Sequence, residues 1–141
     1  MAAPSSLTRM NGDRDLRTLL GGIRPELNPG RYVLTLSPGP LPADLTPAVL
    51  ITEPEGVTLV VRQEQADAAA LAYDYVVGWI TLSAQCAIEA VGLTAAVATE
   101  LAAHGISCNV VAGYHHDHLF VPYERAEEAV GVLNDLALRA S

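Results

Sequence analysis

The strongest constraint on the fold is the stretch of residues 75–99, in which Glu89 is the only charged residue. A helix of about 20 apolar residues can cross a bilayer, but Glu89 would then lie near the middle of the span. Gly78, Gln85 and Gly92 also interrupt the apolar run. Its first part is rich in β-branched and aromatic residues, as strands are, whereas its second part has helical periodicity. The stretch therefore predicts a buried strand, a loop and a buried helix in a soluble protein.

The composition excludes several classes of binding partner and of catalytic chemistry. The chain of 141 residues has 8 basic and 16 acidic residues, a net charge of −8 and a pI of about 4.8. This negative field repels nucleic-acid backbones and anionic lipids, so we expect neither nucleic acid nor membrane as a partner. All of the basic residues are arginines, which excludes a lysine Schiff base and the lysine of a P-loop.

The two cysteines and the first residues bear on the cellular compartment. Cys86 and Cys108 lie in apolar surroundings and outside any CxxC motif, which is typical of reduced, buried thiols. Residues 1–6 contain neither the basic region nor the apolar region of a signal peptide. We therefore expect a cytoplasmic protein.

The second half of the chain has the more regular pattern. Leu93, Val97 and Leu101 give one apolar face to a helix between Gly92 and Gly105. The last helix has an apolar stripe of Ala126, Ala129, Val130, Leu133, Leu136 and Ala137. The expected elements are a strand over 75–83, a loop over 84–91, that first helix, strands over 106–112 and 118–121 around a turn at 114–117, and a helix over 124–139. This order indicates an α+β sandwich of the ferredoxin-like type.

The first half repeats this pattern without its first helix. Residues 33–37, Val-Leu-Thr-Leu-Ser, are similar to residues 79–83, Trp-Ile-Thr-Leu-Ser. The expected elements are a helix over 13–20, a loop over 25–30, a strand over 32–36, a proline-rich connection over 38–47, strands over 48–53 and 57–62, and a helix over 64–73. We therefore divide the chain into a flexible N-terminus (1–12), a degenerate unit with an N-terminal helix (13–73) and a second, more complete unit (74–141).

The densest polar cluster is Tyr-His-His-Asp-His at residues 114–118. Its imidazoles and carboxylate are ligands for zinc or another divalent metal. On a tight turn that leads into a strand, however, only His116 and His118 share a face, and two ligands do not make a site. A metal-dependent enzyme using His116, Asp117 and His118 is therefore the weaker alternative. A thiol hydrolase with Cys86 or Cys108 as nucleophile and His116 as base is also a weaker alternative, because no third residue orients the base. We expect no catalytic residue, no metal and no cofactor.

A second candidate feature is the helix start at Gly92. The free backbone amides of a helix start favour an anion such as an α-carboxylate, and a glycine lets a ligand approach the backbone closely. The alternative is that Gly92 is only a helix cap. The carboxylate of Asp117 could hold an ammonium group, and the two features would meet where the sheets of two units pack edge to edge. Such a pair of opposite charges fits a free amino acid.

Three segments carry a family resemblance: residues 91–94 (Val-Gly-Leu-Thr), 101–110 (Leu-Ala-Ala-His-Gly-Ile-Ser-Cys-Asn-Val) and 114–122 (Tyr-His-His-Asp-His-Leu-Phe-Val-Pro). They resemble the ACT-domain family, and within it the small bacterial tandem-ACT proteins related to the ACT units of CASTOR-type arginine sensors. The resemblance implies a βαββαβ unit that binds a small effector, commonly an amino acid, at an interface between units. It implies backbone contacts from Gly92, Leu93 and Thr94 and a ligand contact from Asp117. We count His116 with them as a ligand-binding residue.

The chain also departs from this family pattern. The first unit lacks its first helix, and no strand follows the last helix. The sheet must then be completed by the strand from Tyr75 serving both units or by the N-terminal part. With no catalytic domain attached, the resemblance implies a non-catalytic regulatory protein, a homodimer, that acts on a separate enzyme. The alternative is a protein-interaction module with a vestigial pocket, whose sheet edge recruits a partner.

Overall fold

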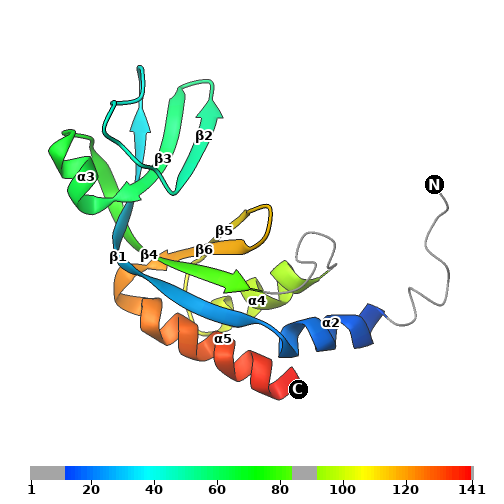
Figure 1. Ribbon diagram of the computed structural model, residues 1–141. Coiled ribbons are helices and arrows are strands. Elements are labelled where there is room, and N and C mark those ends of the chain that lie inside the picture. Colours follow the sequence, from blue (N-terminus) through cyan, green and yellow to red (C-terminus); the bar gives the residue numbers. More distant parts are fainter. Residues whose placement is uncertain (1–11, 84–91, 141) are drawn as a thin grey trace, which may run out of the picture.

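The computed structural model describes residues 12–83 and 92–140 (Figure 1). They form a six-stranded antiparallel sheet in the order β2-β3-β1-β4-β6-β5. The strands are β1 (Arg24–Ser37), β2 (Val49–Glu53), β3 (Gly56–Arg62), β4 (Tyr73–Ser83), β5 (Asn109–Ala112) and β6 (Asp117–Pro122). The helices are α2 (Gly12–Gly21), α3 (Gln63–Ala68), α4 (Leu93–Ala103) and α5 (Ala126–Ala140), with the short 3-10 helix η1 (Tyr123–Arg125) before α5. The predicted α+β, ferredoxin-like class with two related units is confirmed.

The long strands β1 and β4 join the two halves of the sheet. Residues 32–37 of β1 pair with β3, whereas residues 24–28 pair with the last part of β4. The first unit therefore takes its fourth strand from the beginning of β4, and the second unit takes its fourth strand from the beginning of β1. Both of the expected ways of completing the sheet are used.

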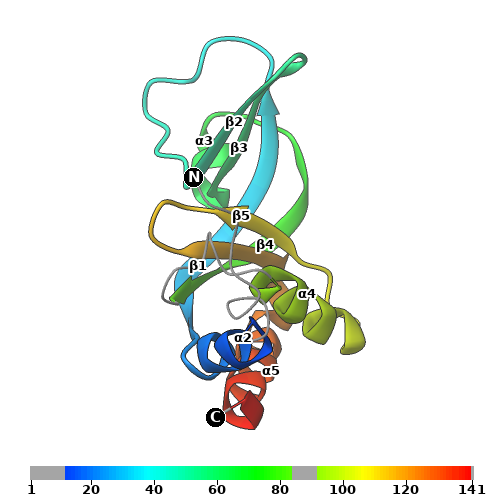
Figure 2. The same cartoon turned by 90° about the vertical axis from the view of Figure 1, so that its right-hand side faces the viewer.

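All the described helices lie on one face of the bent sheet, which is its convex face in Figure 1. Figure 2 shows α2, α4 and α5 together beneath the strands of the second unit. Between these helices and the sheet lies the largest core cluster, whose fully buried residues include Ile80, Leu82, Leu93, Leu119 and Leu133. The shorter α3 covers Val33, Leu59 and Val61 of the first unit.

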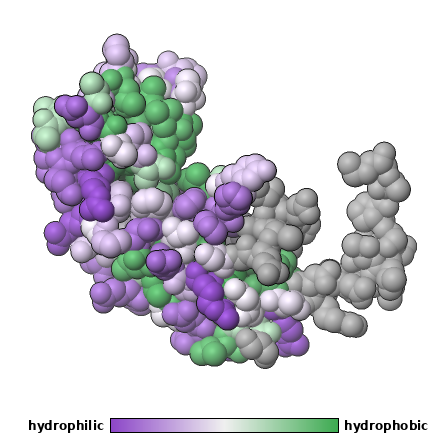
Figure 3. Space-filling model, viewed as in Figure 1, coloured by the Kyte–Doolittle hydropathy of each residue, from purple (hydrophilic) through white to green (hydrophobic). Residues whose placement is uncertain are grey.

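The concave face has no helix in the described part of the chain, and aromatic side chains cover its centre. Tyr32 and Phe120 are 5% and 2% exposed and belong to one cluster with Trp79 packed against it. The Tyr32 and Trp79 rings meet edge to face at 5.3 Å between centroids. Figure 3 shows apolar surface on the concave side of the first unit, over β2 and β3.

Most predicted elements of the second unit are confirmed. Gly92 and Gly105 flank α4, and its buried residues are Leu93, Val97 and Leu101 as expected. In α5 the buried set includes Val132, which was missed, whereas Val130 and Leu136 are only partly buried. The predicted strand over 106–112 is shorter, because β5 begins at Asn109. The loop predicted over 84–91 lies outside the described residues, as does the flexible N-terminus apart from Gly12.

Two expectations in the first unit are wrong. The predicted loop over 25–30 is part of β1, although Pro25 and Pro29 cannot donate a backbone hydrogen bond. They are tolerated because β3 pairs only with residues 32–37, so the beginning of β1 has one neighbour among the described strands. The strand has an irregularity after this segment: its pairing with β4 shifts register between Asn28 and Tyr32, and Gly30 lies there with φ +101°. The helix expected over 64–73 ends at Ala68, and Tyr73 already begins β4.

None of the described helices is long and apolar enough to cross a membrane.

Candidate functional site

Asp117 and the start of α4 lie at the same end of the second unit. Asp117 is the first residue of β6 and pairs with Leu82, near the end of β4. The chain continues from β4 through residues 84–91 to Gly92 and α4, and Leu93 packs in the same cluster as Leu82. Both features therefore lie at one end of the sheet of the second unit. Their meeting with another unit at an edge-to-edge interface stays a prediction.

Asp117 is a buried residue whose carboxylate has no hydrogen-bonding partner among the described residues. The residue is 4% exposed and lies on the helix-covered face with Leu119 and Val121. No hydrogen bond to the carboxylate exists among the described residues, yet no fully buried side-chain oxygen or nitrogen there lacks a partner. Its oxygens therefore reach the surface. Burial raises the pKa of Asp117 above its usual range, and His118 partly opposes this. Such a carboxylate is suited to receive a positively charged group.

The start of α4 offers backbone amides and no acidic side chain. Gly92 has φ +90° in the left-handed region, and no side chain of the described residues caps the helix. Its first turn contains no acidic residue. The Leu93 side chain is fully buried in the core and the Thr94 side chain is exposed, so the backbone is what these positions offer. A Cβ at residue 92 would lie 3.3 Å from Leu16 Cδ2, so glycine allows α2 to pack closely beside this helix start.

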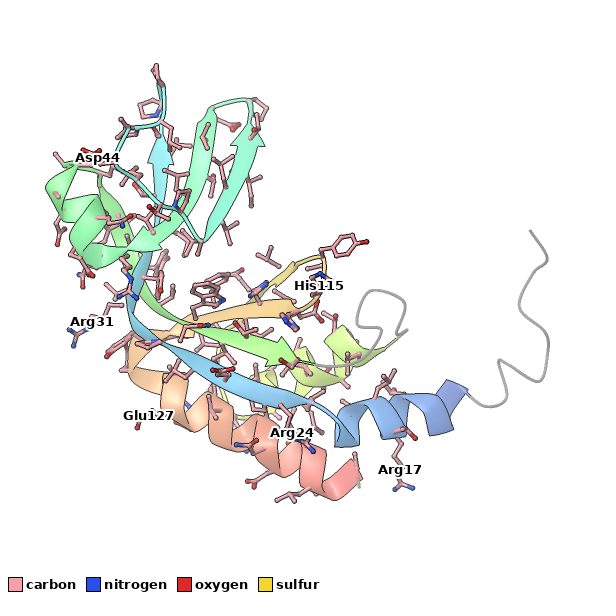
Figure 4. All side chains as sticks on the ribbon, viewed as in Figure 1. Arg17, Arg24, Arg31, Asp44, His115 and Glu127 are labelled. Atoms are coloured by element: carbon pink, nitrogen blue, oxygen red, sulfur yellow. The ribbon has the colours of Figure 1, made fainter. Side chains whose placement is uncertain are left out.

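The described part of the chain does not bring His116 and Asp117 together in a metal site. His116 is exposed on the turn between β5 and β6, where its carbonyl accepts a 2.8 Å hydrogen bond from the Gly113 amide. Figure 4 shows the neighbouring His115 at the tip of this turn. Asp117 faces the helices, whereas His118 lies on the opposite face of β6. Among the described residues no group of three or more such ligands is placed to hold a metal ion.

His118 has a structural contact that sequence reasoning missed. The Trp79 Nε1–H donates a 3.0 Å hydrogen bond to His118 Nδ1, joining two residues 39 positions apart. Burial, and then the neighbouring His116, lower the pKa of His118. The ring is therefore held neutral as an acceptor. Only the alternation of the strands, which places Trp79 and His118 on one face, could have indicated this contact.

This contact makes stability depend on pH. The pKa of His118 is lower in the folded state than in the unfolded state. Its contribution to the free energy of unfolding is therefore complete above about pH 6.5 and is lost as the pH falls from there through the folded-state pKa. We expect a loss of about 0.5–1.5 kcal/mol in unfolding free energy, the value of one hydrogen bond. Urea unfolding between pH 7 and pH 5 measures it. If the unfolding free energy of His118→Gln depends on pH as steeply as that of the wild type, the assignment of this pH dependence to His118 is contradicted. His115→Gln is the control and should behave as the wild type does.

The thiol alternative finds no support at Cys108. Its side chain packs against the core cluster, and burial raises the pKa of the Cys108 thiol to about 11. A thiol with such a pKa is a poor nucleophile at neutral pH. Cys86 lies outside the described residues.

Comparisons with known proteins agree with this architecture. Two models of the ACT domain match the chain, over residues 11–78 and 75–135. A Vibrio cholerae protein of unknown function, described as a possible transport protein, is 46% identical, with a TM-score of 0.81 over 89% of this chain and 98% of that one. A search of curated proteins gives no match.

More distant solved structures share the fold. An Agrobacterium tumefaciens protein has 19% identity and a TM-score of 0.65, covering 82% of this chain and 89% of that one. The ligand-free regulatory subunit of aspartate kinase from Thermus thermophilus has 11% identity and a TM-score of 0.61, covering 79% and 95%. On the two matching models and the shared fold, the chain belongs to the ACT-domain family, with two ACT domains in tandem.

Proposed function

We propose that this protein is a non-catalytic regulator that binds a free amino acid at the end of the second unit. The observation that carries the proposal is Asp117, a residue that is 4% exposed and whose carboxylate, open to the surface, has no hydrogen-bonding partner among the described residues. Burial of the residue raises the pKa of this carboxylate, so a bound cation would offset the cost of its charge. An ammonium group would supply both the opposite charge and the missing donors.

The start of α4 indicates the second charged group of the ligand, a carboxylate. The backbone amides at the start of a helix bind anions without any side chain. In a chain without lysine, such amides are one of the few ways to hold a carboxylate. The start of α4 after Gly92 has no acidic residue to compete. A zwitterion fits this arrangement because each of its charges faces a complementary group.

The regulatory role is supported by the family. ACT domains are typically regulatory and bind amino acids, and structural neighbours of this chain include a regulatory subunit of an aspartate kinase. In the proposal the amino acid changes how the protein contacts a separate enzyme in the cytoplasm.

A thermal-shift screen of the standard amino acids tests the proposal. At a concentration a hundred times its Kd, the correct ligand stabilises the fold by about 2.7 kcal/mol. The N-acetyl derivative of that amino acid lacks the ammonium group, and its amide lacks the carboxylate. Both should fail to stabilise. If no amino acid raises the melting temperature at millimolar concentration, the sensor proposal is contradicted and an interaction module becomes the better account.

The same proposal includes a homodimer through β2. This strand is an edge of the sheet, and Leu50 and Ile51 remain 49% and 45% exposed on its two faces. Exposed apolar edge strands pair with other strands, and a second copy offers the same edge in antiparallel orientation.

A charge in this edge should prevent pairing. We expect Ile51→Lys to be a monomer under conditions where the wild type is a dimer, as measured by light scattering after size exclusion. Leu138→Lys is the matched control, because Leu138 is 72% exposed on α5. A monomeric wild type, or a dimeric Ile51→Lys, would contradict pairing through β2.

A further inference from the structure

A cavity of about 670 Å³ lies at the junction of the two units. It exists because the pairing of β4 with β6 stops at Val77, opposite Pro122. The beginning of β4, residues 73–76, continues into the first unit with β1 on one side only among the described strands. The space between this free edge, the end of β6 and the beginning of β5 is the cavity.

The walls of the junction cavity combine an apolar surface with two carboxylates. Leu34, Val76 and Phe120 form part of the apolar lining, and Asp74 and Glu124 supply the acids. Tyr75, which is 72% exposed, contributes an aromatic ring. None of the described residues that line the cavity carries a positive charge.

The guanidinium next in sequence to Glu124 is already engaged. Arg125 contacts Glu128 through Nε and Nη2 at 2.8 and 2.9 Å, and Nη2 also donates to the His104 carbonyl at 2.9 Å. Neither Asp74 nor Glu124 forms a salt bridge among the described residues, although Glu124 interacts electrostatically with Arg125. An incoming cation could interact with both.

We propose that the junction cavity binds an organic cation with an apolar body and no carboxylate, such as an arylalkylammonium ion. A volume of about 300–1,000 Å³ is usual for small-molecule sites. The ammonium group would lie between Asp74 and Glu124, with the Tyr75 ring available for a cation–π contact. The apolar body would cover Val76 and Phe120.

This site is separate from the one proposed for an amino acid. Asp117 is at the first residue of β6, whereas the junction cavity lies at its last residue, Pro122. The carboxylate of an amino acid would be repelled by Asp74 and Glu124 in the cavity, because both acids carry the same sign. The two sites therefore select different classes of ligand.

An amide NMR titration with phenethylamine tests the proposal, with phenylacetate and L-phenylalanine as probes of the same body and different charge. We expect saturable shifts at Tyr75, Val76 and Asn109 with phenethylamine alone. Asp74→Asn and Glu124→Gln should each weaken binding about two- to fivefold, as expected for exposed ion pairs. Glu127→Gln, an exposed acid outside the cavity lining, and Asp117→Asn should leave the affinity unchanged.

Each outcome is decisive. Saturable shifts that weaken in both cavity variants and persist in both controls support the proposal. The absence of saturable shifts with phenethylamine, equal shifts with phenylacetate or L-phenylalanine, or an unchanged affinity in Asp74→Asn or Glu124→Gln would overturn it. Loss of binding in Asp117→Asn would also overturn it, because the two sites would then not be separate. The amide spectrum of each variant checks that it is folded.

Discussion

Leu133→Ala is expected to lower the free energy of unfolding by about 2–5 kcal/mol, the range for deleting a buried leucine side chain. Leu133 is 0% exposed and lies in the main core cluster between α5 and the sheet, with Leu93, Leu101 and Leu119. The backbone around this site is held by α4, α5 and the strands together, so the cavity would collapse only in part. Urea unfolding followed by far-UV circular dichroism measures the effect.

Leu138→Ala provides the matched control on the same helix. Leu138 is 72% exposed, so its truncation should change the unfolding free energy by less than about 0.5 kcal/mol. If the two variants lose similar stability, α5 does not pack on the sheet through the face described. The comparison is independent of any ligand.

Asp117→Asn is expected to weaken binding of the amino acid found in the screen by about 1–3 kcal/mol, or roughly 5- to 150-fold in Kd. The variant keeps the size of the side chain but removes the charge that faces the ammonium group. Isothermal titration calorimetry measures the change. Asp135→Asn, an exposed acid on α5, should bind as tightly as the wild type.

The same substitution should not destabilise the free protein. Burial raises the pKa of Asp117, so the folded state disfavours the ionised form. The ionised carboxylate therefore costs stability once the pH rises above the pKa of an unfolded aspartate, about 4. At pH 7, Asp117→Asn should melt at the same or a higher temperature than the wild type. A clearly lower melting temperature without ligand would instead indicate a structural role for the carboxylate.

Local patterns in the sequence were enough to predict the second unit. Gly92 and Gly105 mark both ends of α4, and the spacing of Leu93, Val97 and Leu101 gives its buried face. These signals depend on neighbours within a few residues. The turn before β6 was likewise visible, and with it the candidate residue Asp117.

The sequence did not predict features that depend on distant pairing. Pro25 is tolerated in β1 because that end of the strand has one described neighbour, which only the sheet order reveals. The bond between Trp79 and His118 joins two strands. The junction cavity collects residues from 34 to 124, and no local motif links them. Burial of Asp117 without a partner also required the packing of the helices.

The most direct test of the amino-acid site is the pKa of the Asp117 carboxyl group, measured by carbon-13 NMR with and without the ligand. We expect a pKa above the usual range for the free protein, because the carboxylate is buried. On binding, the ammonium group would stabilise the ionised form, and the pKa of Asp117 would fall. A pKa that stays the same when the site is saturated would show that the ligand does not bind through Asp117 and would contradict the proposed site.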